Sequence, residues 1–226
     1  MEESYLKLKI GSPLAKLQNE VLKKKNLFQL GTSGAIPEYL WTRNKKVRKP
    51  EDMKGLKIRV AGKVEAKVIQ ILGASPVTMP SAEVAQALQR GVVDGVLMNP
   101  WTASGRGIEE YCKYILMYSF SNQSAPIYTL RDKWESWPED VKKVLMDVAV
   151  KWESQFIGGK GSTINEYQLK TEIIPFYEKK GMKAVYITAK EKKVFAEAIQ
   201  PIVQWWVKQV GKEVGEKALK AAGYQD

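Results

Sequence analysis

The sequence predicts an α/β fold built on a doubly wound sheet, and residues 51–98 carry that prediction. Residues 56–60 alternate apolar and basic side chains, which is typical of a strand with one apolar face. Residues 92–98 are almost wholly apolar, which is typical of a parallel strand covered on both faces. Helical patterns lie between these strands. The order strand, helix, strand, helix, strand with short connections indicates a doubly wound unit.

Two predicted helices connect the strands of this unit. The first has apolar residues at positions i, i+4, i+7 and i+8, namely Val64, Val68, Ile71 and Leu72. Gly73 ends this helix as a C-terminal glycine does, and a short strand over residues 74–79 follows. Ser81 is expected to cap the second helix, with Glu83 in its first turn, and Gly91 to stop it.

Three further elements are predicted before residue 51. Residues 5–25 indicate a short, strongly basic helix. Residues 27–34 indicate a strand that runs into a Gly/Ser loop. Residues 39–47 indicate a second strand, and Pro50 with the acidic residues after it suits a turn.

The second half of the chain is predicted to be mostly helical. Pro138 starts a long helix, whose apolar stripe consists of Val141, Val144, Leu145, Val148, Trp152 and Phe156. A helix through roughly residues 161–180 and a strand over residues 183–188 follow. Thr188 and Glu191 form a capping box for the next helix, which Pro201 kinks or ends.

Composition narrows the possible functions. The chain has 226 residues, one cysteine (Cys112) and no histidine, so histidine-based catalysis and clusters of Cys or His metal ligands are excluded. Catalysis by lysine, tyrosine or carboxylates stays open but lacks a motif, and the sequence gives no reason to expect a catalytic residue, a metal or a cofactor. The first residues show no signal-peptide pattern, so the chain as given is cytosolic, already processed or truncated at its front.

The net charge of +11 raises the alternative of a nucleic-acid or anionic-surface binding protein. The lysines are spread along the whole chain, and their densest runs fall in amphipathic or loop segments. No RNA-binding, zinc-finger or helix-turn-helix signature accompanies them. A solvated, lysine-rich surface is therefore favoured over a nucleic-acid partner.

Two segments, "RKPEDMKGLKIRVAG" and "LGASPVTMPSAEVAQALQRGVVDG", closely resemble the DctP-type solute-binding proteins of tripartite ATP-independent periplasmic (TRAP) transporters. The resemblance covers nearly all of residues 27–226. It implies a periplasmic-binding-protein-like fold of two α/β lobes around a cleft, closing about hinges in the crossing strands. It also implies a non-enzymatic, periplasmic protein that delivers a small organic acid to membrane permease subunits, as a monomer or homodimer.

The resemblance also implies a division of the chain. Residues 1–37 would be a remnant of the first lobe and residues 38–123 the second lobe, with its core in residues 56–98. Residues 124–170 would form a crossing strand and a long helix returning to the first lobe. Residues 171–226 would form a strand and helices packing on the second lobe. The front of the first lobe and the signal peptide are expected to lie outside this sequence.

Arg59 is the leading candidate for ligand binding. The arginine of the "K-x-R-V" strand is the usual carboxylate clamp of the family that the chain resembles. The position also has a physical basis, because ligands of open α/β sheets bind beyond the carboxyl ends of the strands. A guanidinium matches a carboxylate bidentately, and a buried arginine needs a partner. The structural alternative is an ion pair with Asp94, Glu83 or another nearby carboxylate.

Five weaker candidates complete the predicted site. Asn99 follows the strand at residues 92–98 and has an amide suited to a carboxylate or hydroxyl, although an Asn-Pro loop explains it equally well. Trp101 is a candidate pocket wall or a packing residue. Asn122 and Gln123 fall where the chain should cross between lobes. Tyr39 stands where family members that bind sialic acid have a second arginine, so a simpler monocarboxylate or an aromatic acid is expected.

Overall fold

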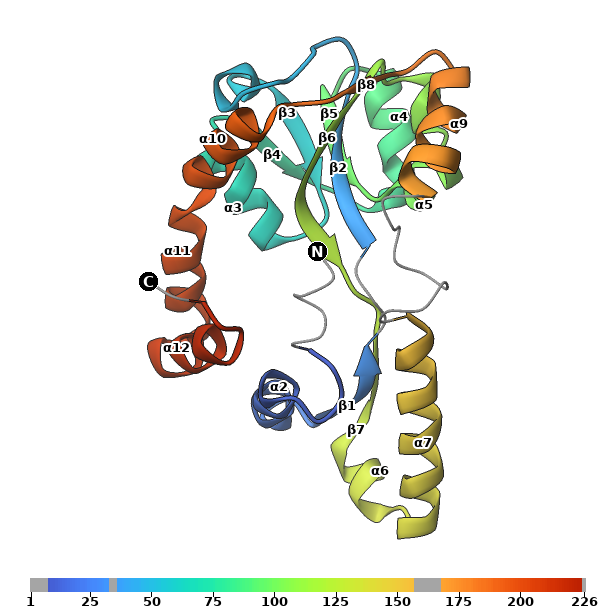
Figure 1. Ribbon diagram of the computed structural model, residues 1–226, viewed down its shortest axis with the longest axis vertical. Helices are drawn as coiled ribbons and strands as arrows, with labels where there is room; N and C mark the ends of the chain where they lie inside the picture. The colour runs from blue at the N-terminus through green and yellow to red at the C-terminus, as the bar shows by residue number, and fades with distance from the viewer. Residues whose placement is uncertain (1–7, 33–35, 157–167, 225–226) are drawn as a thin grey trace. The chain divides into compact units, whose positions relative to one another are not determined.

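A computed structural model describes residues 8–32, 36–156 and 168–224 (Figure 1). The chain divides into two units, each assembled from separate stretches of sequence. Unit 1 comprises Met1–Ile36, Gln123–Ile164 and Val207–Asp226, and unit 2 comprises Pro37–Asn122 and Asn165–Trp206. In this division residues 207–226 fall in unit 1, and the rest of the 171–226 segment falls in unit 2.

The framework of unit 2 is a six-stranded mixed sheet with the strand order β4-β3-β5-β2-β6-β8. Its strands are β4 (Ser75–Thr78), β3 (Lys57–Val60), β5 (Gly95–Met98), β2 (Ile36–Thr42), β6 (Tyr114–Gln123) and β8 (Lys183–Val185). β3 is parallel to both β4 and β5, and β6 is parallel to β8, whereas β2 is antiparallel to β5. The predicted α/β class and the parallel core are thus confirmed.

Helices cover both faces of this sheet, as Figure 1 shows. One face carries α3 (Lys63–Ile71) and α10 (Ala189–Ile199), and the other carries α4 (Val84–Gln89), α5 (Pro100–Gly105) and α9 (Ile174–Lys179). Successive residues of β2 point to opposite faces of the sheet. Leu40 therefore packs in the core on the α3 side, whereas Tyr39 and Trp41 pack in the core on the α4 side. Burial on both faces explains why these strands have few polar residues.

Short helices and turns join these elements. They are the 3₁₀ turns η1 (Pro50–Met53), η2 (Ser81–Glu83) and η3 (Ile108–Glu110). Ser81 opens η2, and α4 starts at Val84 without a side-chain cap, so the predicted cap was wrong. Thr188 and Glu191 do form the predicted capping box, and Pro201 begins a new helix, α11 (Pro201–Val210).

Two predicted strands are shorter or shifted in the structure. β2 covers Ile36–Thr42; the Arg43 N–H still donates to the Asp94 carbonyl, and the Thr42 hydroxyl donates to the Lys45 carbonyl where the chain bends away. The apolar run from residue 92 is only partly a strand. Its first residue, Val92, donates its N–H to Ala87 of α4, so β5 begins at Gly95. Gly95 allows close strand packing, since a Cβ there would lie 2.4 Å from the Trp41 carbonyl oxygen.

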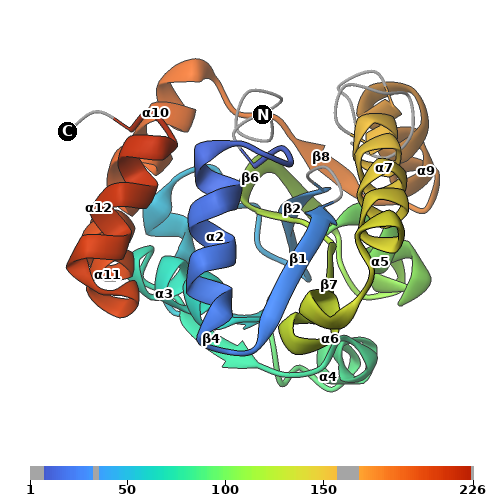
Figure 2. The same ribbon diagram turned by 90° about the horizontal axis from the view of Figure 1, so that it is seen from below.

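Unit 1 is built on a two-stranded antiparallel sheet of β1 (Leu27–Thr32) and β7 (Pro126–Leu130). Two helices, α2 (Pro13–Lys23) and α7 (Glu139–Phe156), lie on either side of β1 (Figure 2). α6 (Arg131–Ser136) follows β7, and α12 (Lys212–Ala221) contacts α2. α2 begins at Pro13, after the cap Ser12, and ends at Lys23, so it is shorter than the predicted helix over residues 5–25, of which residues 5–7 lie outside the described residues.

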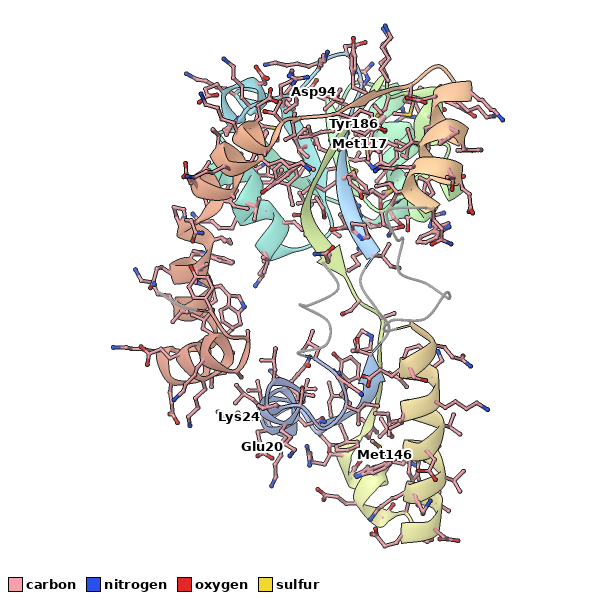
Figure 3. All side chains as sticks on the ribbon, viewed as in Figure 1. Glu20, Lys24, Asp94, Met117, Met146 and Tyr186 are labelled. Atoms are coloured by element: carbon pink, nitrogen blue, oxygen red, sulfur yellow. The ribbon has the colours of Figure 1, made fainter. Side chains whose placement is uncertain are left out.

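The apolar stripe of α7 is only partly buried. Ala149 and Glu153 face the interior of unit 1, and the Glu153 carboxylate accepts the Ile10 N–H at 2.9 and 3.1 Å. Val144 and Val148 are mostly exposed. Beside α7 lies a cavity of about 330 Å³, lined in part by Ile10, Phe28 and the labelled Met146 (Figure 3).

The predicted helix at residues 161–180 lies partly outside the described residues. Its described part is a π-helical turn, Leu169–Ile173, followed by α9. In the portion of the chain that the structure describes, no helix combines the length and apolar character needed to cross a bilayer.

Candidate functional site

Arg59 lies in β3 one residue before its carboxyl end, and only 4% of it is exposed. Its Nε and Nη2 donate to the Met79 carbonyl oxygen at 3.0 and 2.9 Å, and its Nη1 contacts the Leu97 carbonyl oxygen at 3.5 Å. These acceptors are neutral. Burial lowers the pKa of the guanidinium, and the charges of Glu65 and Glu38 oppose that effect. β3 therefore holds a buried cation. The carbonyl groups that accept its hydrogen bonds carry no charge that would offset it.

The alternative ion pair with Asp94 does not form. Figure 3 shows Asp94 at the edge of the sheet where β5 begins, and its carboxylate accepts the Lys57 N–H at 2.8 Å. Lys57 is the first residue of β3, whereas Arg59 is next to its last residue. The contact of Asp94 therefore lies at the opposite end of the strand from Arg59. Asp94 thus joins the starts of β3 and β5.

Two glutamates from different elements lie close to Arg59. Glu38 is 1% exposed in β2, and its Oε2 accepts the Ser121 hydroxyl at 2.5 Å. Glu65 lies in the first turn of α3, where its Oε2 accepts the N–H groups of Ala61 and Gly62 at 2.7 and 3.0 Å. The two carboxyl groups interact closely enough for Glu65 to raise the pKa of Glu38. We call Glu38 and Glu65 the acid pair.

Burial raises the pKa of Glu38 to about 7. Ser121 and Arg59 act against this shift, whereas Glu65 adds to it through its charge and its hydrogen bond. Because two carboxylates in contact repel each other, the pair is most stable with one proton. Glu38 is thus a buried acid at the same end of the sheet as Arg59.

Asn99 has a structural task in this region. It is buried after β5, and its Oδ1 accepts the Thr102 N–H at 2.9 Å, which caps α5. Tyr39 is also buried, opposite Met98 in the β2–β5 pairing, and burial raises its pKa to about 12. Trp101 lies in α5 and is 47% exposed. The structure brings Arg59, Asn99 and Tyr39 to one edge of the sheet, since Arg59 reaches Leu97, two residues before Asn99.

The last two predicted residues lie at the end of β6. Asn122 is exposed and directly follows Ser121, the partner of Glu38. Gln123 is partly buried and belongs to unit 1. Asn122 thus lies in unit 2 on the segment that reaches the acid pair.

Glu38, Glu65 and Ser121 were not predicted as site residues. A glutamate inside an otherwise apolar strand was the available signal for Glu38. Its contact with Ser121 joins residues 83 positions apart, which a strand pattern does not reveal. Glu65 lies three residues after Gly62, which is the spacing of a helix cap.

Two surface cavities among the described residues have linings that do not include Arg59. A cavity of about 450 Å³ in unit 2 lies around Arg48 and Glu191, and the cavity in unit 1 lies beside α7. Neither is lined by Arg59. Across residues 8–32, 36–156 and 168–224, no group of three or more His, Cys, Asp or Glu is arranged to hold a metal ion.

Comparison with known proteins gives a consistent picture. The family model of DctP, "Bacterial extracellular solute-binding protein, family 7", matches residues 2–209. The C4-dicarboxylate-binding periplasmic protein DctP of Rhodobacter capsulatus is 28% identical over an alignment of 178 residues, and the match covers 76% of this chain and 50% of that protein. The chain therefore spans about half the length of this curated relative.

Solved structures match the fold over nearly the whole chain. An extracytoplasmic solute receptor of Bordetella pertussis binding pyroglutamic acid has a TM-score of 0.83 at 21% identity, covering 98% of this chain and 70% of the receptor. A TRAP periplasmic solute-binding protein of Rhodoferax ferrireducens with bound malonate has a TM-score of 0.82 at 20% identity. That match covers 99% of this chain and 70% of the other. At these identities the likeness concerns the fold.

Proposed function

Because this chain belongs to family 7 of the bacterial extracellular solute-binding proteins, the DctP family, we propose that it captures a small organic acid through Arg59. We propose further that it acts in the periplasm and presents the acid to the membrane permease of a TRAP transporter. The observation that carries the proposal is the buried guanidinium at the carboxyl end of β3.

The surroundings of Arg59 support a role as a carboxylate clamp. Its position is the one at which open α/β sheets bind ligands. Its hydrogen bonds go to backbone carbonyls, which orient the guanidinium but do not neutralise it. A ligand carboxylate would supply the opposite charge in a fork geometry that one ammonium group cannot provide.

The ligands of similar proteins favour an organic acid. The Bordetella pertussis receptor binds pyroglutamic acid and the Rhodoferax ferrireducens protein binds malonate. Both ligands carry a carboxylate, which is the group that Arg59 would receive. Asn99, Trp101, Tyr39, Asn122 and Gln123 stay candidate contacts for the rest of the ligand.

The test is a calorimetric titration of the chain with pyroglutamate and malonate. Arg59→Ala is expected to weaken binding by roughly 2–5 kcal/mol, because the ligand carboxylate would lose a desolvated partner. Arg59→Lys is also expected to bind poorly, since it lacks the planar fork. The affinity of the unchanged chain should depend only weakly on salt, unlike binding to phosphate groups.

Arg48→Ala is the matched control. Arg48 is an arginine of the same unit, paired with Glu191 at 2.8 Å beside the larger cavity. The control should leave the affinity unchanged. Full affinity in Arg59→Ala would disprove the clamp, and a loss confined to Arg48→Ala would move the binding site to that cavity.

A further inference from the structure

Three elements of unit 2 contribute polar side chains at the end of the sheet that holds Arg59. Glu38 comes from β2, Glu65 from the first turn of α3 and the Ser121 hydroxyl from β6. The charges that shift the pKa of Glu38 are those of Glu65, which raises it, and Arg59, which lowers it. A carboxyl group is rarely as deeply buried as Glu38 unless it is neutral or paired.

The two members of the pair have different environments. Glu65 accepts two backbone N–H groups and lies at the positive end of α3, so its surroundings stabilise a carboxylate. Glu38 accepts one hydroxyl and is almost entirely removed from water. The proton of the pair therefore belongs on Glu38.

The charges near Arg59 then favour the protonated state. When Glu38 is neutral, one nearby carboxylate, Glu65, acts on Arg59, which still directs its hydrogen bonds to backbone carbonyls, whereas ionised Glu38 adds a second negative charge in a buried site. A carboxylate bound at Arg59 adds another negative charge. Its arrival therefore makes ionised Glu38 still less favourable, which is a coupling between ligand binding and proton binding.

We propose that Glu38 and Glu65 share one proton beside Arg59, and that a carboxylate ligand binds at Arg59 together with a proton taken up by this pair. The inference rests on the proposed function, because it assumes that Arg59 holds the ligand carboxylate. It assigns Glu38 a positioning and charge-setting role rather than a direct ligand contact. The site then selects the combination of an organic anion and a proton.

The proposal predicts the direction of a pH effect. Ligand affinity is greatest where Glu38 is already protonated and falls as the pH rises and a proton must be taken up. The affinity for pyroglutamate should fall roughly tenfold between pH 6 and pH 8, because Glu38 loses its proton only above about pH 7 and one proton limits the slope to tenfold per pH unit. Pyroglutamate is suitable because its own carboxyl group stays ionised across this range.

The first experiment needs no ligand. The side-chain carboxyl groups of the ¹³C-labelled chain are titrated by NMR, and the Glu38 signal is identified by its loss in Glu38→Gln. Glu38 should titrate near neutral pH, and Glu65→Gln should shift that titration to lower pH. The control Glu153→Gln, at a buried glutamate of unit 1, should leave it unchanged. Titration of Glu38 in the range of an exposed glutamate would overturn the acid pair.

The second experiment measures proton uptake on binding. Pyroglutamate is titrated into the chain at pH 8 in phosphate and in Tris, whose different ionisation enthalpies reveal the protons exchanged. The chain should take up as much as one proton per ligand, and Glu38→Gln, which mimics the neutral acid, should take up none. Glu38→Gln should also bind about equally well at pH 6 and pH 8.

The two proposals fail in different ways. A flat pH profile and no proton uptake, together with a loss of affinity in Arg59→Ala, would overturn the coupling and leave the clamp in place. Affinity unaffected by Arg59→Ala would overturn the proposed function and with it the coupling. In that case the NMR titration of the ligand-free chain would still decide whether Glu38 and Glu65 share a proton.

Discussion

Units 1 and 2 are built on sheets of very different size. Unit 2 has six strands with helices on both faces and two apolar cores, whose side chains include Leu40, Ile58 and Trp41 at 0% exposure. The sheet of unit 1 has two strands, and its long helix α7 leaves Val144 and Val148 exposed. A two-stranded sheet is marginal by itself, whereas a sheet covered on both faces supplies its own core.

The comparison indicates where stability and function lie. Arg59 and the acid pair belong to the unit with the larger core, so a well-packed scaffold holds the candidate site. In unit 1 the Glu153 carboxylate of α7 accepts the Ile10 N–H, a polar contact between α7 and the segment before α2. Substitutions in the two units should therefore differ in cost.

The largest difference is expected for apolar deletions. Leu40→Ala removes a fully buried side chain of β2 from the core on the α3 side of the sheet. It should lower the free energy of unfolding by about 2–5 kcal/mol. The corresponding deletion in unit 1, Val148→Ala, affects a side chain that is 60% exposed. It should change the free energy of unfolding by less than about 0.5 kcal/mol. Urea unfolding of both variants measures the contrast, and equal losses would contradict it.

The next effect concerns pH. The pKa of Glu38 is raised from 4.5 to about 7 by burial, so the folded state holds its proton more tightly than the unfolded chain. The resulting stability is present below pH 4.5 and is lost as the pH rises through about 7, at a cost on the order of 3 kcal/mol.

Glu38→Gln should remove this pH dependence, while Glu153→Gln in unit 1 should retain it. Urea midpoints at pH 4.5 and pH 8 for the three proteins test the difference. A slope in Glu38→Gln as steep as that of the unchanged chain would show that Glu38 is not responsible; a smaller slope is expected to remain, because burial also raises the pKa of Glu153.

The smallest effect is expected for a helix contact in unit 1. A Cβ on Gly215 of α12 would lie 2.9 Å from the Val207 Cγ1 and 3.1 Å from its Cα. Gly215→Ala should therefore destabilise the chain by about 1–3 kcal/mol through overpacking. The control Gly105→Ala meets no atom within 4 Å and should be neutral or stabilising, because alanine favours helices. Thermal unfolding separates the two, and an equal response would exclude overpacking.

The sequence predicted those parts of the fold that depend on local patterns. The strand at β3, the helix α3 and the capping box of Thr188 follow from periodicity and spacing. The prediction of a buried apolar stripe on α7 was only partly right. Burial depends on which face of the helix meets β1, and Ala149 and Glu153 make that contact.

The candidate site was predictable only in part. Arg59 could be selected from its place at the end of a strand, and it is indeed buried there. Its acceptors, the carbonyls of Met79 and Leu97, carry no sequence signal, since every residue has a carbonyl group. Glu38 was missed because its partners come from α3 and β6, which only the folded sheet brings together.

The interleaving of the two units has a consequence for how the chain folds as it is synthesised. Unit 2 has all its residues once position 206 has been made, whereas unit 1 also needs residues 207–226, where α12 packs on α2. A ribosome adds roughly 5–20 residues per second, and contacts between distant residues are slow to form. The α2–α12 contact joins opposite ends of the described chain, so it is expected to form later than the more local contacts within the sheet of unit 2.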